Sequence, residues 1–119
     1  MLAGHSESSI GGDRTENNRG MKDLWVVRID ENGTKLWDKR YGGDGNEWLG
    51  NILSISDGGY LLSANTESSS QNGDVEDPAK GSSDFWIVRL ADDGSKLWDR
   101  RLGGDGWEWT ARSTLTEDG

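Results

Sequence analysis

Apolar residues in this chain come in short runs, and turn-forming residues separate the runs. Residues 24–29 and 84–90 are two such runs, both rich in β-branched and aromatic side chains. Runs of this kind, bounded by Gly, Asn and Asp, predict β-strands. No segment repeats its apolar residues every three to four positions with capping residues at its ends. The pattern therefore predicts no helix.

The same pattern predicts further strands on either side of polar turns. They cover residues 2–6, 34–41, 47–56, 60–66, 95–101 and 107–117. Tight turns are expected at residues 30–33 and 57–59, where Gly supplies a positive φ. A long polar loop, rich in Ser, Gly, Asn and Asp, covers residues 67–83. The whole chain is thus expected to consist of short strands and loops.

Much of the chain repeats after 61 residues. Between residues 22–58 and 83–119, 18 of 37 positions are identical at this offset. The tryptophans keep the register, with Trp25 matching Trp86, Trp37 matching Trp98 and Trp48 matching Trp109. Self-similarity at a fixed, long period is typical of repeat architectures.

Four short antiparallel strands per repeat are typical of a β-propeller blade. The expected fold class is all-β, with two four-stranded antiparallel blades per chain; a two-layer sandwich is the alternative. A single two-repeat unit is expected over residues 1–119. It begins with three strands of an incomplete blade (1–41), continues with a full blade (46–102) and ends with a complementing strand (107–117).

Residues 30–42 contain Asp, Gly, Trp and Gly in the spacing Asp-x-x-Gly-x-x-x-Trp-x-x-x-x-Gly. Residues 91–103 keep this spacing, except that Ala91 replaces the first Asp. The pattern resembles the tryptophan-docking motif of quinoprotein-type propellers. The resemblance implies that each indole wedges between adjacent blades, near the turn glycine.

A longer pattern runs through both repeats. Its pieces are Asp84-Phe-Trp86-Ile-Val-Arg89-Leu90, Gly94, Trp98, Gly103-Gly104, Asp57-Gly-Gly-Tyr60 and Gly73-Asp74-Val75. This pattern is similar to repeats in large secreted or surface proteins of Bacteroidetes-like bacteria. The resemblance implies a propeller with an extracellular or cell-surface location, and it carries no known activity. The first residues show no signal-peptide pattern of their own.

Two blades cannot close a ring, because propellers have about four to eight blades. The N-terminal strand lacks its neighbour, and the C-terminal strand at 107–117 would supply it to another copy. Such head-to-tail contacts close only as a cyclic homo-oligomer. Three chains would give six blades and four chains eight. The resemblance to eight-bladed relatives favours the tetramer slightly, and a fragment of a longer propeller is the alternative.

Composition narrows the classes of partner. The 119 residues carry a formal net charge of −9, which argues against nucleic-acid binding. The chain has no apolar run long enough to insert into a membrane. It has no Cys, which excludes disulfides and thiolate metal sites. Seven Trp in so polar a chain indicate a packed structure, since disordered chains avoid large apolar side chains.

Acidic residues recur in the Gly-Asp-Gly loops. They are Asp44, Glu47, Asp105 and Glu108. One hypothesis is a carboxylate ring that binds cations or sugar hydroxyls, for which Ca²⁺ would be the suitable ion. The alternative is turn chemistry, in which Asp bonds its own backbone. No metal-ligating spacing is present, so neither a metal nor another cofactor is predicted.

The tryptophans fall into two groups. Those at strand centres are predicted to form the core between blades: Trp25, Trp37, Trp86 and Trp98. Those beside the Gly-Asp-Gly loops could stack on a sugar ring: Trp48, Trp107 and Trp109. Arg28 and Arg89 alternate with the apolar positions and are expected to pair with carboxylates such as Asp23 or Asp38.

The sequence contains no nucleophile–base pair and no phosphate-binding loop, so no enzyme activity is predicted. The expected function is a non-enzymatic binding or scaffold module that assembles with copies of itself. A carbohydrate-binding lectin, with sites at the blade junctions, is the alternative. A glycan or a surface molecule would then be the external partner.

Overall fold

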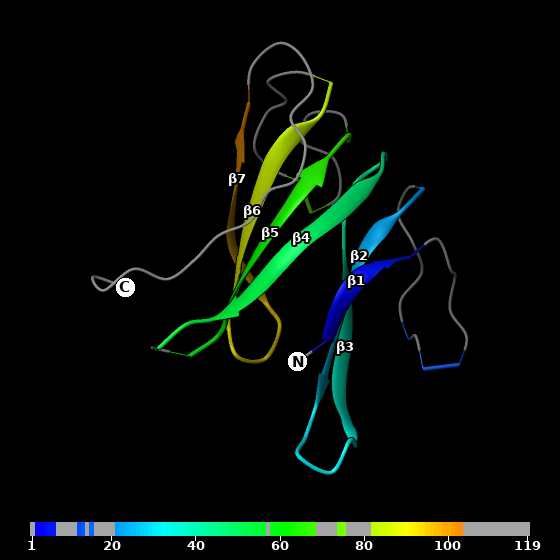
Figure 1. Cartoon of the computed structure of the whole chain (residues 1–119), viewed down its shortest axis with the longest axis vertical. Coiled ribbons are helices and arrows are strands. Elements are labelled where there is room, and N and C mark those ends of the chain that lie inside the picture. The colour runs from blue at the N-terminus through cyan, green and yellow to red at the C-terminus, as the bar shows by residue number, and fades with distance from the viewer. Residues whose placement is uncertain are drawn as a thin grey trace.

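The computed structural model contains two antiparallel β-sheets (Figure 1). It describes residues 2–6, 12–13, 15, 21–56, 58–68, 74–75 and 82–103. The first sheet has the order β1-β2-β3 and the second the order β4-β5-β6-β7. The strands are β1 (Leu2–Ser6), β2 (Asp23–Ile29), β3 (Lys35–Tyr41), β4 (Glu47–Ser54), β5 (Tyr60–Thr66), β6 (Asp84–Leu90) and β7 (Lys96–Leu102).

The all-β, antiparallel fold predicted from the sequence is confirmed, and the described residues include no helix. Each strand pairs with the next one along the chain within its sheet. The predicted strands at residues 2–6, 60–66 and 84–90 have the bounds that the pattern gave them. The predicted complementing strand at 107–117 lies outside the described residues.

The β2–β3 and β6–β7 turns lie at the same end of the molecule (Figure 1). Each turn has a glycine with positive φ, 85° at Gly33 and 88° at Gly94. Asp30 caps the first turn by accepting hydrogen bonds from two backbone N–H groups. Asp93 accepts one from the N–H of Ser95 in the second turn. Ala91 stands at the position equivalent to Asp30, and the capping Asp lies two residues further along the turn. The second turn is therefore capped although its first Asp is missing.

One hydrophobic core joins the two sheets. β1 and β2 contact β4, and Lys22 forms an isolated bridge with Asn46 at the start of β4. The buried core draws on both sheets and consists of Leu24, Val26, Tyr41, Tyr60, Leu62, Ala64, Val75, Trp86, Val88 and Leu90. The first sheet therefore packs against the second as a neighbouring layer.

Strands β2 and β6 are repeat equivalents, yet they bury opposite faces. Side chains alternate between the two faces of a strand. We call the face with Arg28 in the first sheet and Arg89 in the second the docking face. The face with Trp25 in the first sheet and Trp86 in the second is the receiving face. The docking face of the first sheet packs on the receiving face of the second, because Leu24 and Val26 share a core with Trp86 and Val88.

Candidate functional site

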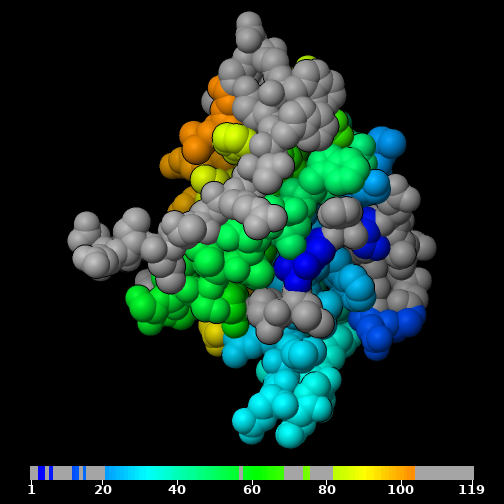
Figure 2. Space-filling model, in the orientation of Figure 1, coloured from blue at the N-terminus to red at the C-terminus, as the bar shows by residue number. Residues whose placement is uncertain are grey.

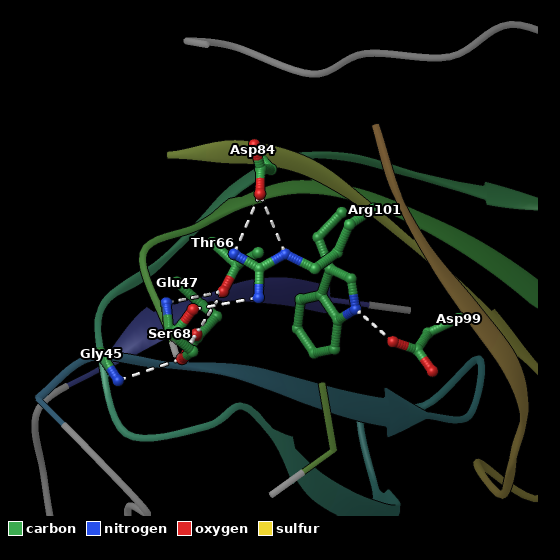
Figure 3. A network of polar contacts seen from close by, with 8 residues as sticks. Gly45, Glu47, Thr66, Ser68, Asp84, Asp99 and Arg101 are labelled. Atoms are coloured by element: carbon green, nitrogen blue, oxygen red, sulfur yellow. Dashed lines mark hydrogen bonds and ion pairs between the residues drawn. The ribbon is translucent and has the colours of Figure 1, made fainter. Parts of the chain in front are cut away.

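A buried polar network lies where β4 begins (Figure 3). The Glu47 carboxylate accepts hydrogen bonds from the hydroxyls of Thr66, at 2.8 Å, and Ser68. The Ser68 hydroxyl in turn accepts one from the backbone N–H of Gly45. Arg101 donates to the carbonyl of Ser68 at 3.0 Å. The network therefore ties the loop before β4 to the ends of β5 and β7.

Arg101 also forms an ion pair with Asp84, with both Nε and Nη2 3.1 Å from the same carboxylate oxygen (Figure 3). Both side chains are fully buried. A buried ion pair needs further hydrogen bonds to offset its desolvation, and Nη1 of Arg101 makes one of them with the Ser68 carbonyl. These side chains tie the second sheet together at the end where β4 begins and β5 and β7 end.

Burial raises the pKa of Glu47 to about 7, although the hydrogen bonds from Ser68, Thr66 and Gly43 act against this shift. The neighbouring carboxylate of Asp23 adds to the rise. A Cβ added at Gly42 would lie 2.3 Å from Asp23 Oδ1 and 2.7 Å from Glu47 Oε2. Glycine at position 42 is therefore required by the close approach of two carboxylates.

The predicted ligand residues near this loop do not form one open site. Asp44 is exposed, Glu47 is buried in the polar network, and Trp48 is half-buried. Glu47 and Trp48 are adjacent in β4 and so lie on opposite faces of the sheet. Lys22 places its ammonium 4.1 Å from the centroid of the Trp48 ring. The other predicted ligand residues, Asp105, Trp107, Glu108 and Trp109, lie outside the described residues.

A contact between an indole, a carboxylate and an amine occurs in both repeats. Trp25 donates its indole N–H to Asp38 at 3.1 Å, and Lys35 bonds the same carboxylate. Its equivalent, Trp86, donates to Asp99 at 2.9 Å, and Lys96 bonds that carboxylate. This structural role was not predicted from the sequence. The signal was available, since the Lys-Leu-Trp-Asp motif repeats in register with the strand tryptophans.

Asp38 has a further partner in Thr15. Burial alone would raise the pKa of Asp38, but hydrogen bonds from Thr15, Trp25 and Lys35 outweigh it and lower the pKa to about 2. The Thr15 backbone N–H and hydroxyl donate at 3.0 and 2.7 Å. The carboxylate is thus held charged at neutral pH and fixes Thr15 against β3.

The two sheets meet at Trp37 and Gly94. A Cβ added at Gly94 would lie 3.1 Å from two ring atoms of Trp37, so the indole packs directly on the glycine backbone. The Tyr41 hydroxyl donates to the Gly94 carbonyl. The indole of one repeat therefore lies on the turn glycine of the next repeat within the same chain.

Arg28 adds polar contacts to this interface. Its guanidinium forms a 2.7 Å ion pair with Asp92 and a hydrogen bond with the Tyr60 hydroxyl. Arg89, the equivalent residue, donates to the backbone carbonyls of Gly58 and Leu90. Arg28 thus pairs with a carboxylate, as predicted, but with Asp92 of the neighbouring sheet and not with Asp23 or Asp38. Repeat spacing alone does not give this partner, because it lies across the junction of the two sheets.

The residues equivalent to Trp37 and Gly94 are Trp98 and Gly33, and they lie at opposite outer sides of the chain. A Cβ added at Gly33 would meet no atom of the described residues within 4 Å, and the β2–β3 turn projects from the molecule (Figure 2). Trp98, the equivalent of Trp37, is 44% exposed. An open hollow of about 510 Å³ lies on the receiving face of the first sheet, lined in part by Trp25, Val27 and Gly33.

The four strand tryptophans thus occupy different surroundings. Trp86 is fully buried in the core, and Trp37 packs against that core at the junction of the sheets. Trp25 lines the hollow, and Trp98 is exposed on the docking face of the second sheet. Only the first two lie between the two sheets of one chain.

No protein-family model and no curated protein sequence matches this chain. Among the described residues, no helix is long and apolar enough to cross a membrane. The same residues contain no group of three or more His, Asp or Glu side chains that could hold a metal ion. The feature that stands out in the described part of the chain is the pair of open, repeat-related faces.

Proposed function

We propose that this chain is a non-enzymatic β-propeller module whose copies assemble head to tail into a closed ring used for binding or scaffolding. One observation carries the proposal. The docking face of the first sheet covers the receiving face of the second, while the remaining face of each kind stays open at an outer side of the chain. Two surfaces that fit each other within the chain can also fit between chains.

Contacts of this kind are heterologous, since two different surfaces meet. Heterologous contacts give a ring when the rotation closes and an open filament when it does not. A propeller closes with about four to eight blades, so three copies would give six and four copies eight. The resemblance to eight-bladed propellers favours four copies.

The binding role would lie at the loop end of the ring. Tight turns at 30–34 and 91–95 occupy one end of the sheets, and the longer connections leave from the other (Figure 1). Functional residues on rigid scaffolds are concentrated in the longer loops. By resemblance, the ring would act outside the cell or at its surface.

A carbohydrate-binding function is the second candidate. The partly accessible indole of Trp48 favours it, because an aromatic ring can stack on the apolar face of a sugar. The Lys22 ammonium over the Trp48 ring weighs against it, since that ring face is already used. Tryptophan fluorescence titrated with a panel of sugars decides the matter: no shift for any of them would remove the lectin hypothesis.

The ring is tested by the native mass in solution, measured by size-exclusion chromatography with light scattering. We expect three or four times the mass of one chain, constant over a tenfold dilution. A folded single chain at all concentrations would contradict the proposal and would favour a small two-sheet sandwich. Masses that grow with concentration would indicate a filament and would contradict a closed ring.

A further inference from the structure

We propose that Trp98 of one copy packs on the turn glycine Gly33 of a second copy, with an ion pair between Arg89 and Glu31 beside it. This inference rests on the proposed function, since it names the contact through which the copies would assemble. It is obtained from the interface between the two sheets of one chain. In each contact, the residue of the first sheet is replaced by its equivalent one repeat later. The residue of the second sheet is replaced by its equivalent one repeat earlier.

The first contact to move is the indole on the glycine. Trp37 lies on Gly94 within the chain. One repeat later Trp37 becomes Trp98, and one repeat earlier Gly94 becomes Gly33. Gly33 and Gly94 have nearly the same φ, 85° and 88°, so both turns present the same bare backbone to an incoming ring. The receiving surface is thus already formed at Gly33.

Both halves of the moved contact are open. Trp98 is 44% exposed, and among the residues that the structure describes no atom lies within 4 Å of the Cβ position at Gly33. The adjoining hollow is lined by Trp25, Val27 and Ile29, whose equivalents in the second sheet are fully buried. Burying an exposed indole and an apolar hollow together is favourable, because both remove apolar surface from water.

The second contact to move is the ion pair. Arg28 pairs with Asp92 at 2.7 Å within the chain. The moved pair is Arg89 with Glu31, so the charges remain complementary although Asp has become Glu. Glu31 is exposed in the projecting β2–β3 turn (Figure 2). Arg89 would have to leave the carbonyls of Gly58 and Leu90 to reach it.

A third contact moves in the same way. The carboxylate of Asp74 accepts a hydrogen bond from the backbone N–H of Gly42 at 3.0 Å. The moved pair is Asp13 with Gly103, and both residues are exposed. The Asp13 carbonyl already accepts from Lys35 as that of Asp74 accepts from Lys96, so the two segments are placed alike. The acceptor side of the contact is therefore preformed.

One side chain of the interface has a different chemistry in the second repeat. Tyr41 donates to the carbonyl of Gly94, whereas its equivalent Leu102 cannot donate a hydrogen bond. Leu102 is 53% exposed and would add apolar surface at the same place. The contact between copies is thus expected to be more apolar than the contact within the chain. A second copy fits these surfaces because one chain already carries both halves of the interface.

The first experiment separates the two halves of the contact. Trp98→Ser removes the docking indole, and Gly33→Asn adds a side chain to the glycine while allowing a positive φ. We expect each variant alone to have the native mass of one chain. An equal mixture should give a dimer and nothing larger, because each pair of chains has one intact contact. Leu97→Ser, at an exposed neighbour of Trp98, is the matched control and should keep the wild-type mass.

The second experiment uses charge and does not depend on core packing. Arg89→Glu and Glu31→Arg should each weaken assembly at least tenfold in dilution experiments, and the double variant should restore it. Restoration supports a direct pair and excludes a folding defect in either single variant. If Trp98→Ser does not fold, this experiment alone decides the inference.

The two proposals fail in different ways. A wild-type chain that is single at every concentration overturns the ring and this inference together. A wild-type ring that survives Trp98→Ser, Gly33→Asn and both charge reversals overturns only this inference. That second result would mean that the copies meet through other surfaces of the chain.

Discussion

The two repeats have closely similar strands but bury them differently. In β2, Leu24 and Val26 are fully buried, whereas Trp25 and Val27 remain partly exposed. In β6 the order is reversed: Trp86 and Val88 are fully buried, whereas their neighbours Phe85 and Ile87 are partly exposed. Burial in this molecule is therefore decided by where the neighbouring sheet lies, since the strand sequences hardly differ.

The comparison also explains why these strands are apolar on both faces. A strand that covers one core face and leaves the other in water normally alternates apolar and polar residues. Here both faces carry large apolar side chains, as expected for a sheet that is meant to be covered twice. Each sheet of the chain is covered once by its partner sheet.

The largest expected difference between the repeats concerns their two equivalent arginines. Arg101 and Asp84 are both fully buried, whereas Arg40 and Asp74 are partly exposed at 11% and 21%. Removing one partner of a buried pair leaves an uncompensated charge and costs about 3–5 kcal/mol. The Arg40–Asp74 pair keeps some contact with water, so the charge left behind when it is broken is better solvated and the cost is smaller. We therefore expect Arg101→Ala to lower the free energy of unfolding more than Arg40→Ala, measured by urea titration at one protein concentration.

Equal losses for the two arginine variants would contradict this difference. They would mean that the buried Arg101–Asp84 pair contributes no more to the free energy of unfolding than the partly exposed Arg40–Asp74 pair. Arg101→Lys is a useful control, because it keeps the charge but loses the planar geometry that reaches both Asp84 and Ser68.

The next effect is a dependence of stability on pH that comes from Glu47. Its folded pKa of about 7 lies above the ordinary glutamate value of 4.5. The folded state then binds the proton more tightly than the unfolded state, so the contribution of Glu47 to stability is fully present below about pH 4.5 and is lost as pH rises through 7. The size of this contribution is up to about 3 kcal/mol.

Urea titrations between pH 5 and 8, for wild type and Glu47→Gln, measure this effect. Gln keeps an acceptor for Thr66 and Ser68 but does not titrate, so the slope over this range should flatten. An unchanged slope in the variant would show that another group binds the proton. The first repeat offers a contrast, since the pKa of Asp38 is lowered to about 2 and its contribution is lost only under strongly acidic conditions.

A smaller effect distinguishes the two turn glycines. Gly33 and Gly94 share a positive φ, so the backbone strain of a substitution to Asn is nearly equal at both. At Gly94 the new side chain would also meet Trp37, and overpacking of this kind costs about 1–3 kcal/mol. In a Trp98→Ser background, where assembly should not contribute, Gly94→Asn should be the less stable variant by urea titration. Equal stabilities would mean that Trp37 moves aside at little cost.

Much of the fold could be predicted from the sequence. Alternating and β-branched runs located the described strands, and Asn, Asp and Gly located the turns. The 61-residue repeat aligned Trp37 with Trp98 and Gly33 with Gly94. These features depend on neighbours in the chain, so a single sequence records them.

The contacts between sheets could not be predicted in the same way. The burial of Glu47 depends on Thr66 and Ser68, and the partner of Arg28 is Asp92 in the other sheet. Repeat spacing shows which residues of the two repeats are equivalent. It does not show which member of an equivalent pair is buried and which is exposed. Trp98 illustrates the point, since it matches Trp37 in sequence and is nevertheless exposed.

The smallest effect is expected at Leu36 and Leu97, where the two repeats should behave alike. The register shifts between Arg28 and Ile29, and between Arg89 and Leu90, leave both leucines out of the strand pairing. A residue at such a bulge points away from the regular ladder, and the two leucines are 54% and 57% exposed.

Serine at either position should change the free energy of unfolding by less than about 0.5 kcal/mol, as is usual for exposed sites. Urea titration of the two variants at the same protein concentration checks this. A large loss at Leu97 alone would place this bulge inside the contact between copies. Because Leu36 has the same bulge and the same exposure, such a difference could come only from what covers the second sheet, and the docking face would then have to be extended to include Leu97.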